Sequence, residues 1–137
     1  PVLAAALRRT LVPWSVNALA QAVGVAALAD EDYVRATRGF VTQERGRLSA
    51  ELSALPGLQV FPGSANYLLV RMSRGRRDAA DLAARLLRQG IAIRVCDDFE
   101  GLSRSYFRVA VRTIEEDDRL LAELRSLLAP PELSPDI

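Results

Sequence analysis

The apolar and polar positions in the first thirty residues predict two helices. Residues 1–11 follow a short helical pattern, which we expect to be left over from a preceding domain. A second helix is expected to begin at Pro13, with Trp14 and Ser15 at its start, because proline is favoured in the first helical turn. Up to residue 30 this segment is rich in alanine and apolar nearly all round, which is typical of a helix buried between two bodies.

A third helix is predicted over residues 31–55. Asp30 is placed to cap its start, and Pro56 with Gly57 ends it. Its apolar residues recur every seven positions and form one stripe, with arginine and glutamate on the other side. The members of this stripe are Val34, Val41, Leu48 and Leu55.

From residue 58 the pattern becomes extended. Residues 58–61 and 66–72 are rich in β-forming side chains and flank the turn at 62–65. A helix is predicted over 78–89 and is stopped by Gly90, and two further strands are predicted over 91–96 and 105–112.

The last helix is predicted to start at a capping box, in which Thr113 caps the first turn and Glu116 reaches back. Pro130 ends it. After the short helical tail of residues 1–11, the order is helix, helix, strand, strand, helix, strand, strand, helix, which predicts an α+β fold, a two-layer αβ sandwich. We expect residues 1–12 to be the tail of a missing large domain, 13–129 to be the small domain, and 130–137 to be a flexible tail.

Composition limits the functional classes. The chain has 137 residues, half of them hydrophobic, and a formal net charge of +1, so we expect neither a nucleic-acid nor a membrane-surface partner. No apolar run approaches the roughly 20 residues that cross a bilayer. The single cysteine, Cys96, fits a reducing compartment, and we expect a cytoplasmic protein. The chain opens without methionine, and we expect it to be a piece of a longer polypeptide.

Two residue types are missing. There is no histidine, and all 18 basic residues are arginine. The usual general base and the commonest metal ligand are therefore missing, and so is the amine that forms a Schiff base with an aldehyde cofactor. The sequence predicts no catalytic residue, no cofactor-binding residue and no metal ligand within this chain.

Two arginines interrupt the last two predicted strands. Arg94 lies in IAIRVC and Arg108 in YFRVAV, and strand alternation places both on the face opposite the apolar side chains. Two guanidiniums on one face could grip a carboxylate or a phosphate. The other interpretation is that each arginine pairs with a nearby acid, for which Asp97, Asp98 and Glu100 are the candidates.

Three stretches resemble a known family. PWSVNALAQ (13–21), SANYLLVRM (64–72) and GIAIRVCDDFEGLSRSYFRVAVRT (90–113) resemble the C-terminal part of fold-type I pyridoxal-phosphate enzymes. They are similar to the branch that contains the histidinol-phosphate aminotransferases and, in particular, to the threonine-phosphate decarboxylases of cobalamin biosynthesis. The resemblance covers roughly residues 3 to 128 and implies the small domain of the aminotransferase fold.

The resemblance also implies roles. Arg108 matches the arginine that binds the substrate α-carboxylate, Arg94 matches the arginine that helps to bind a substrate phosphate, and Asn66 lies near the substrate. The implied cofactor is pyridoxal phosphate, held in the full-length enzyme and not by this fragment, which alone would be inactive. The implied partners are a phosphorylated amino acid, the missing N-terminal large domain and a second copy in a homodimer. A non-catalytic, anion-binding α+β module remains the alternative from another class.

Overall fold

The computed structural model describes residues 2–10, 16–73 and 78–129 of the 137-residue chain. The chain divides into two compact units, Pro1–Thr37 and Arg38–Ile137. The predicted domain boundary at residue 12 lies outside the described residues, so it stays a prediction. The helix α3 (Glu31–Ser53) begins in the first unit and continues into the second.

The first unit contains two further helices, α1 (Val2–Thr10) and α2 (Ala18–Ala29). The second helix begins later than predicted, because the extended Asn17 caps it by accepting a hydrogen bond from the Ala20 N–H at 2.8 Å. The predicted start at Pro13 to Ser15 lies outside the described residues. The helix α2 buries none of its side chains within this chain. The prediction that this helix is buried between two domains or subunits is therefore untested.

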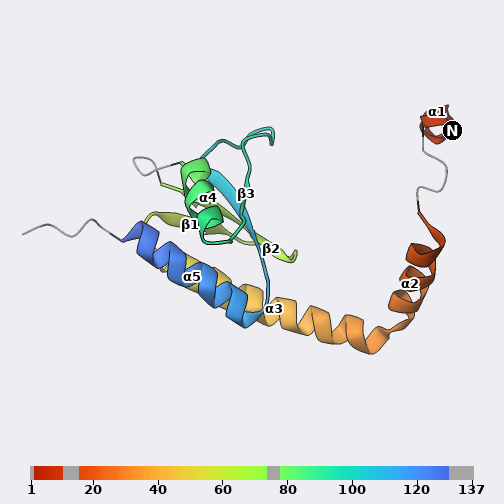
Figure 1. Ribbon diagram of the computed structural model, residues 1–137, viewed down its shortest axis with the longest axis horizontal. Helices are drawn as coiled ribbons and strands as arrows, with labels where there is room; N and C mark the ends of the chain where they lie inside the picture. Colours follow the sequence, from red (N-terminus) through yellow and green to blue (C-terminus); the bar gives the residue numbers. More distant parts are fainter. Residues whose placement is uncertain (1, 11–15, 74–77, 130–137) are drawn as a thin grey trace, which may run out of the picture. The chain divides into compact units, whose positions relative to one another are not determined.

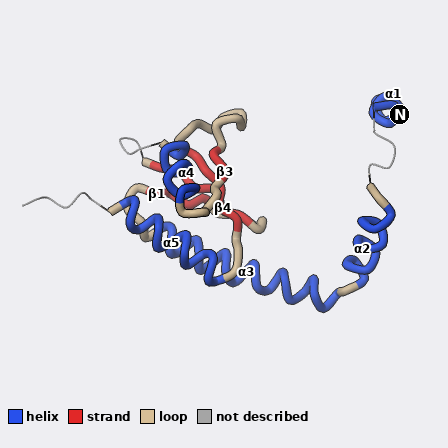
Figure 2. Tube along the Cα trace, viewed as in Figure 1, coloured by secondary structure: helices blue, strands red, loops and turns tan. Residues whose placement is uncertain are grey.

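The second unit is built on a four-stranded antiparallel sheet (Figure 2). Its strand order is β1-β2-β4-β3, with β1 paired to β2, β2 to β4 and β4 to the edge strand β3. The strands are β1 (Leu58–Phe61), β2 (Tyr67–Met72), β3 (Arg94–Val95) and β4 (Tyr106–Ala110).

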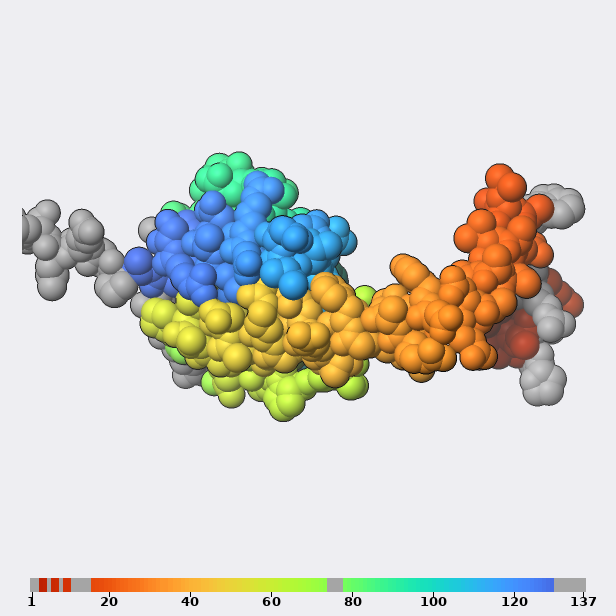
Figure 3. Space-filling view, turned by 90° about the horizontal axis from the view of Figure 1, so that it is seen from below, coloured from red at the N-terminus to blue at the C-terminus, as the bar shows by residue number. Residues whose placement is uncertain are grey.

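Three helices pack on one face of this sheet and form the core. They are α3, α4 (Ala79–Arg88) and α5 (Ile114–Leu128), and α5 lies alongside the second-unit part of α3 (Figures 1 and 3). Two ion pairs join these neighbouring helices, Arg47 with Asp118 and Arg125 with Glu51. The two layers confirm the predicted α+β sandwich. The buried side chains at its centre are Leu48, Leu52, Leu68, Val70, Leu86, Phe107, Val109, Leu121 and Leu124.

The other face of the sheet, called the open face below, carries side chains that remain partly or largely exposed. Antiparallel partners share a face, so the strand registers assign these side chains to it. They are Gln59, Phe61, Tyr67, Leu69, Arg71, Arg94, Tyr106, Arg108 and Ala110.

The predicted strand over residues 91–96 is wrong in extent, since only Arg94 and Val95 form a strand. The turn after α4 uses Gly90 at a φ of 74°, and the Ile91 N–H donates to the Leu86 carbonyl at 3.0 Å. That bond directs Ile91 toward the helix end, and Ile91 and Ile93 pack against the core. The chain reaches β4 only at Arg94, so sheet pairing starts there.

Of the predicted stripe, Leu48 on α3 and Leu55, two residues past its end, are buried, whereas Val34 and Val41 are only partly buried. The stripe also omits a polar member. Glu44 is only 3% exposed, one turn before Leu48. The capping predictions are confirmed. Asp30 accepts from the Tyr33 N–H, and Thr113 with Glu116 forms a complete capping box at the start of α5.

Candidate anion-binding site

Strand pairing brings the two arginines together. Arg94 of β3 and Arg108 of β4 are direct partners in the antiparallel register, so their side chains leave the same face of the sheet. Arg108 is also the partner of Leu69 on β2, which places it on a central strand between its two neighbours. The predicted placement of the arginines on one face, away from the helices, is confirmed.

Arg108 is half-buried, and no acidic residue in the described part of the chain forms an ion pair with it. Its guanidinium carbon lies 4.1 Å from the centroid of the Tyr67 ring, a cation–π contact. Its Nε atom is buried without a hydrogen-bond acceptor, and no carboxylate among the described residues pairs with this side chain. A buried N–H donor without an acceptor is costly, so Arg108 is a cation with unused hydrogen-bonding capacity.

Arg94 differs, because its guanidinium forms an ion pair with Asp98. Both side chains are exposed, by 53% and 58%, so the pair stabilises the fold only weakly. The guanidinium carbon of Arg94 also lies 5.7 Å from the centroid of the Phe99 ring. The ion-pair interpretation is therefore right for Arg94 and wrong for Arg108.

The loop between β3 and β4 carries Asp98 and Phe99 and is held at several points. Gly101 adopts a φ of 81°, and the Leu102 N–H donates to the Phe99 carbonyl at 3.0 Å. At the far end of the loop, the Arg104 side chain pairs with Asp78, the N-cap of α4, at 3.1 Å. These contacts fix the loop that approaches both arginines.

Asn66 precedes β2 by one residue. Its carbonyl accepts a hydrogen bond from the Val111 N–H at 2.9 Å, which extends the β2–β4 pairing. No hydrogen bond joins the Asn66 side chain to Arg94 or Arg108 within the described part of the chain. Its predicted place near a substrate therefore remains a prediction.

Cys96 follows Arg94 but does not share its exposure. Its side chain is fully buried, and its thiol donates to the Arg94 carbonyl at 3.6 Å. Burial raises the pKa of the thiol, while the positive charges of Arg108 and Arg94 act to lower it. The thiol is therefore protonated and unreactive at neutral pH. The described residues contain no group of three potential metal ligands.

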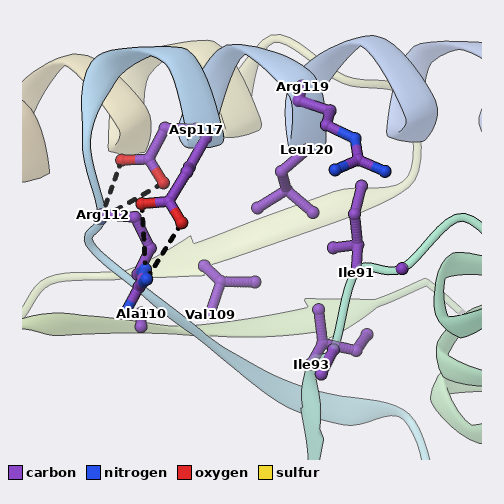
Figure 4. Close-up of a pocket in the computed structure, with 11 residues that line it drawn as sticks. Ile91, Ile93, Val109, Ala110, Arg112, Asp117, Arg119 and Leu120 are labelled. Atoms are coloured by element: carbon purple, nitrogen blue, oxygen red, sulfur yellow. Dashed lines mark hydrogen bonds and ion pairs between the residues drawn. The ribbon is translucent and has the colours of Figure 1, made fainter.

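A separate hollow, with a volume of about 390 Å³, lies between the start of α5 and the segment before β3 (Figure 4). Apolar side chains such as Ile91 and Ile93 form one wall, and Arg112, Glu116 and Asp117 form the polar wall. Those polar groups bond one another, since the Arg112 side chain donates to Glu116 and its N–H donates to Asp117. Neither Arg94 nor Arg108 lines this hollow, so it is not the predicted substrate site.

Asp117 is a buried carboxyl that the sequence did not reveal. Burial raises its pKa to about 6, although the hydrogen bond from the Arg112 N–H opposes that rise, and the nearby Glu44 carboxyl adds to it. Glu44 is itself held by Arg47, whose guanidinium bonds it at 2.5 Å and also reaches Asp118. This cluster ties the start of α5 to α3 on the core side of the sheet.

Two site residues were missed by sequence reasoning, Tyr67 and Phe99. Tyr67 is the register partner of Ala110, so it is the diagonal neighbour of Arg108, within reach of a long side chain. The ring of Phe99 lies 5.9 Å from the Arg108 guanidinium carbon and near that of Arg94 as well. Knowledge of the pairing register between β2 and β4 would have identified Tyr67, but that register cannot be read from the sequence.

Comparison with known proteins gives consistent matches. The sequence profile of the family Aminotransferase class I and II matches residues 1–124. Threonine-phosphate decarboxylase of Salmonella typhimurium is 46% identical over 124 residues, which cover 90% of this chain and 33% of that protein. Histidinol-phosphate aminotransferase of Methanothermobacter thermautotrophicus is 36% identical over 122 residues, 89% of this chain and 33% of that protein.

A structural comparison supports the same family. The histidinol-phosphate aminotransferase from Clostridium acetobutylicum superposes with a TM-score of 0.78 at 28% identity, covering 90% of this chain and 37% of that one. This match confirms the predicted fold class. The chain spans about one third of the length of the curated relatives that it matches.

Proposed function

Because the chain belongs to the aminotransferase class I and II family, we propose that it is the substrate-gripping small domain of a longer pyridoxal-phosphate enzyme. The whole enzyme acts on a phosphorylated amino acid, and its activity is that of a threonine-phosphate decarboxylase in cobalamin biosynthesis. The alternative within the family is an aminotransferase for histidinol phosphate or a related substrate. Family membership disfavours the free-standing anion-binding module.

The observation that carries this proposal is the unpaired guanidinium of Arg108. Arginine is costly to bury without an anion, yet Arg108 is half-buried on a central strand and forms no ion pair with any carboxylate that the structure describes. A substrate α-carboxylate would supply the missing partner, and a guanidinium can hold it with two parallel hydrogen bonds. In this role Arg108 fixes the orientation of the substrate.

Arg94 supports a second contact, to the substrate phosphate. Its ion pair with Asp98 is exposed, so a dianionic phosphate can replace the carboxylate at small cost. Because the two arginines are register partners, one substrate with an anion at each end could bridge them. Holding both ends would set which bond at Cα is aligned for cleavage. Asn66 is a third, weaker candidate for substrate contact.

This chain lacks the side chain that would bind the cofactor covalently. The sequence contains no lysine, so it offers no side-chain amine to the aldehyde of pyridoxal phosphate. We therefore assign cofactor binding to the remainder of the longer protein, where the cofactor would supply the electron sink. The residues described here contribute substrate binding and orientation.

An assay of the full-length protein tests the function. It compares carbon dioxide release from threonine phosphate with amino transfer from histidinol phosphate. Decarboxylation as the dominant reaction is the expected result, since the decarboxylase relative has the higher identity, 46% against 36%. Dominant amino transfer would establish the alternative. If the protein showed neither decarboxylation nor amino transfer, the proposal would be overturned.

We further propose that the whole enzyme is a cytoplasmic homodimer. The single cysteine, which is free and buried, fits a reducing compartment. None of the described helices is both long and apolar enough to cross a membrane. Light scattering of the purified full-length protein measures the oligomeric state.

A further inference from the structure

We propose that Tyr67 is a positioning residue for substrate recognition, because its ring holds the Arg108 guanidinium ready for a carboxylate. This inference rests on the carboxylate-binding role proposed for Arg108. It adds a residue that makes no contact with the anion and acts through the arginine.

The strand register explains why this ring lies against Arg108. Tyr67 pairs with Ala110, two residues along β4 from Arg108, so the two side chains are diagonal neighbours on the open face. The guanidinium carbon lies 4.1 Å from the ring centroid. At that distance the ring is in direct contact with the cation and restricts its movement.

An aromatic ring suits this task better than a carboxylate would. A carboxylate partner stabilises the charge of arginine but occupies its N–H donors, as Asp98 does at Arg94. The ring of Tyr67 attracts the charge through its face and accepts no N–H bond in the guanidinium plane. Arg108 therefore stays positioned while its hydrogen-bonding capacity remains available.

The surroundings of Arg108 indicate that its guanidinium is positioned to bind an anion and does not serve only to stabilise the fold. The Nε atom of Arg108 is buried without an acceptor, and a structural arginine would normally satisfy that donor. Phe99, whose ring lies 5.9 Å from the same guanidinium, adds a second aromatic side chain to the site. Tyr67 is 37% exposed, so its ring is not needed to fill the core.

The test uses the full-length enzyme and four variants, Y67L, Y67F, Y106L and R108Q. Y67L removes the aromatic face, and Y67F keeps it while removing only the hydroxyl. Tyr106 is the matched control, an open-face tyrosine whose ring centroid lies 6.0 Å from that of Phe61 and which is not stacked on Arg108. Three quantities are measured for each variant. They are the KM and kcat for threonine phosphate, and the inhibition constant of phosphoethanolamine, which has the phosphate and amine but no carboxylate.

Y67L should raise the KM for threonine phosphate about three- to tenfold, the range expected for a lost cation–π contact. Its kcat should change much less. Y67F should restore the original KM, and the inhibition constant of phosphoethanolamine should stay constant in both variants. Y106L should leave both constants unchanged.

Two outcomes distinguish a failure of the positioning role of Tyr67 from a failure of carboxylate binding by Arg108. If R108Q weakens threonine phosphate binding but Y67L does not, the positioning role of Tyr67 is overturned while the carboxylate role of Arg108 stands. If R108Q itself leaves threonine phosphate binding intact, the proposed function of Arg108 fails. An equal loss of affinity for threonine phosphate and phosphoethanolamine in Y67L would indicate general damage to the site and would also reject the inference.

Discussion

Arg94 and Arg108 are direct partners across β3 and β4, yet among the residues that the structure describes a carboxylate pairs only with Arg94. Like charges placed directly opposite in a sheet repel each other, so the pair needs compensation. Asp98 supplies it at the exposed edge, and aromatic rings supply it at the central strand. This asymmetry makes the two positions respond differently to mutation.

Replacing Arg108 should reduce substrate affinity without reducing stability. In the full-length enzyme, R108Q should raise the KM for threonine phosphate about 10- to 100-fold, because a charge-assisted hydrogen-bonded contact is lost. Thermal unfolding should be unchanged or shifted upward, since the variant removes a buried donor without an acceptor. R71Q, at an exposed arginine of β2, is the matched control and should alter neither quantity. A large loss of thermal stability in R108Q would show that the arginine is structural.

Removing the carboxylate next to Arg94 should favour phosphate binding. Asp98 competes with an incoming phosphate for the same guanidinium, so D98N should lower the KM for threonine phosphate by about two- to fivefold, the size of an exposed ion pair. R94Q should have the opposite effect. The neighbouring substitution D97N serves as the control, and steady-state kinetics of the full-length enzyme provide the measurement. An increase in KM for D98N would contradict the competition.

Asp117 should make stability depend on pH between about 4 and 6. Burial raises its folded-state pKa to about 6 from the ordinary value of 3.8, so the folded state binds a proton that the unfolded state releases in this window. The free energy of unfolding should therefore fall as pH rises from about 4 to about 6, and this group should add no further change above that range. Urea unfolding of the 137-residue chain at several pH values measures the effect.

The substitution D117N isolates this group. An asparagine oxygen can still accept the Arg112 N–H, which now lies 3.2 Å from the carboxylate, while the titrating charge is removed. The decline between pH 4 and 6 should be smaller in D117N than in the original chain. An unchanged pH profile would show that another group is responsible.

The capping box of α5 should contribute measurably to stability. Thr113 accepts from the Glu116 N–H at 3.4 Å, and Glu116 accepts from the Thr113 N–H at 3.3 Å. T113A should lower the free energy of unfolding by about 1 kcal/mol, whereas T113S keeps the hydroxyl and should lose much less. Urea unfolding of the chain compares the two, and equal losses would mean that the hydroxyl is not the cause.

Local sequence signals predicted most elements because their causes are local. The cap at Thr113, the stop at Gly90 and the alternation around Arg108 depend on neighbours within a few residues. The predicted strand at 91–96 failed because the bond from Ile91 to Leu86 redirects the chain, a contact that alternation does not encode. The burial of Glu44 and Asp117 was also missed, since it arises where α3 packs beside α5, two helices far apart in the sequence.

Strand alternation and composition can be read along the chain, so they are enough to predict a two-layer α+β domain with two arginines on one face of the sheet and no lysine. They do not predict that Arg94 pairs with a carboxylate while Arg108 contacts a tyrosine ring, which depends on how the strands pair. The reason is physical: the register of β2 against β4 brings Tyr67 to Arg108 across about 40 residues of chain, and strand pairing of that kind is set by the packed core.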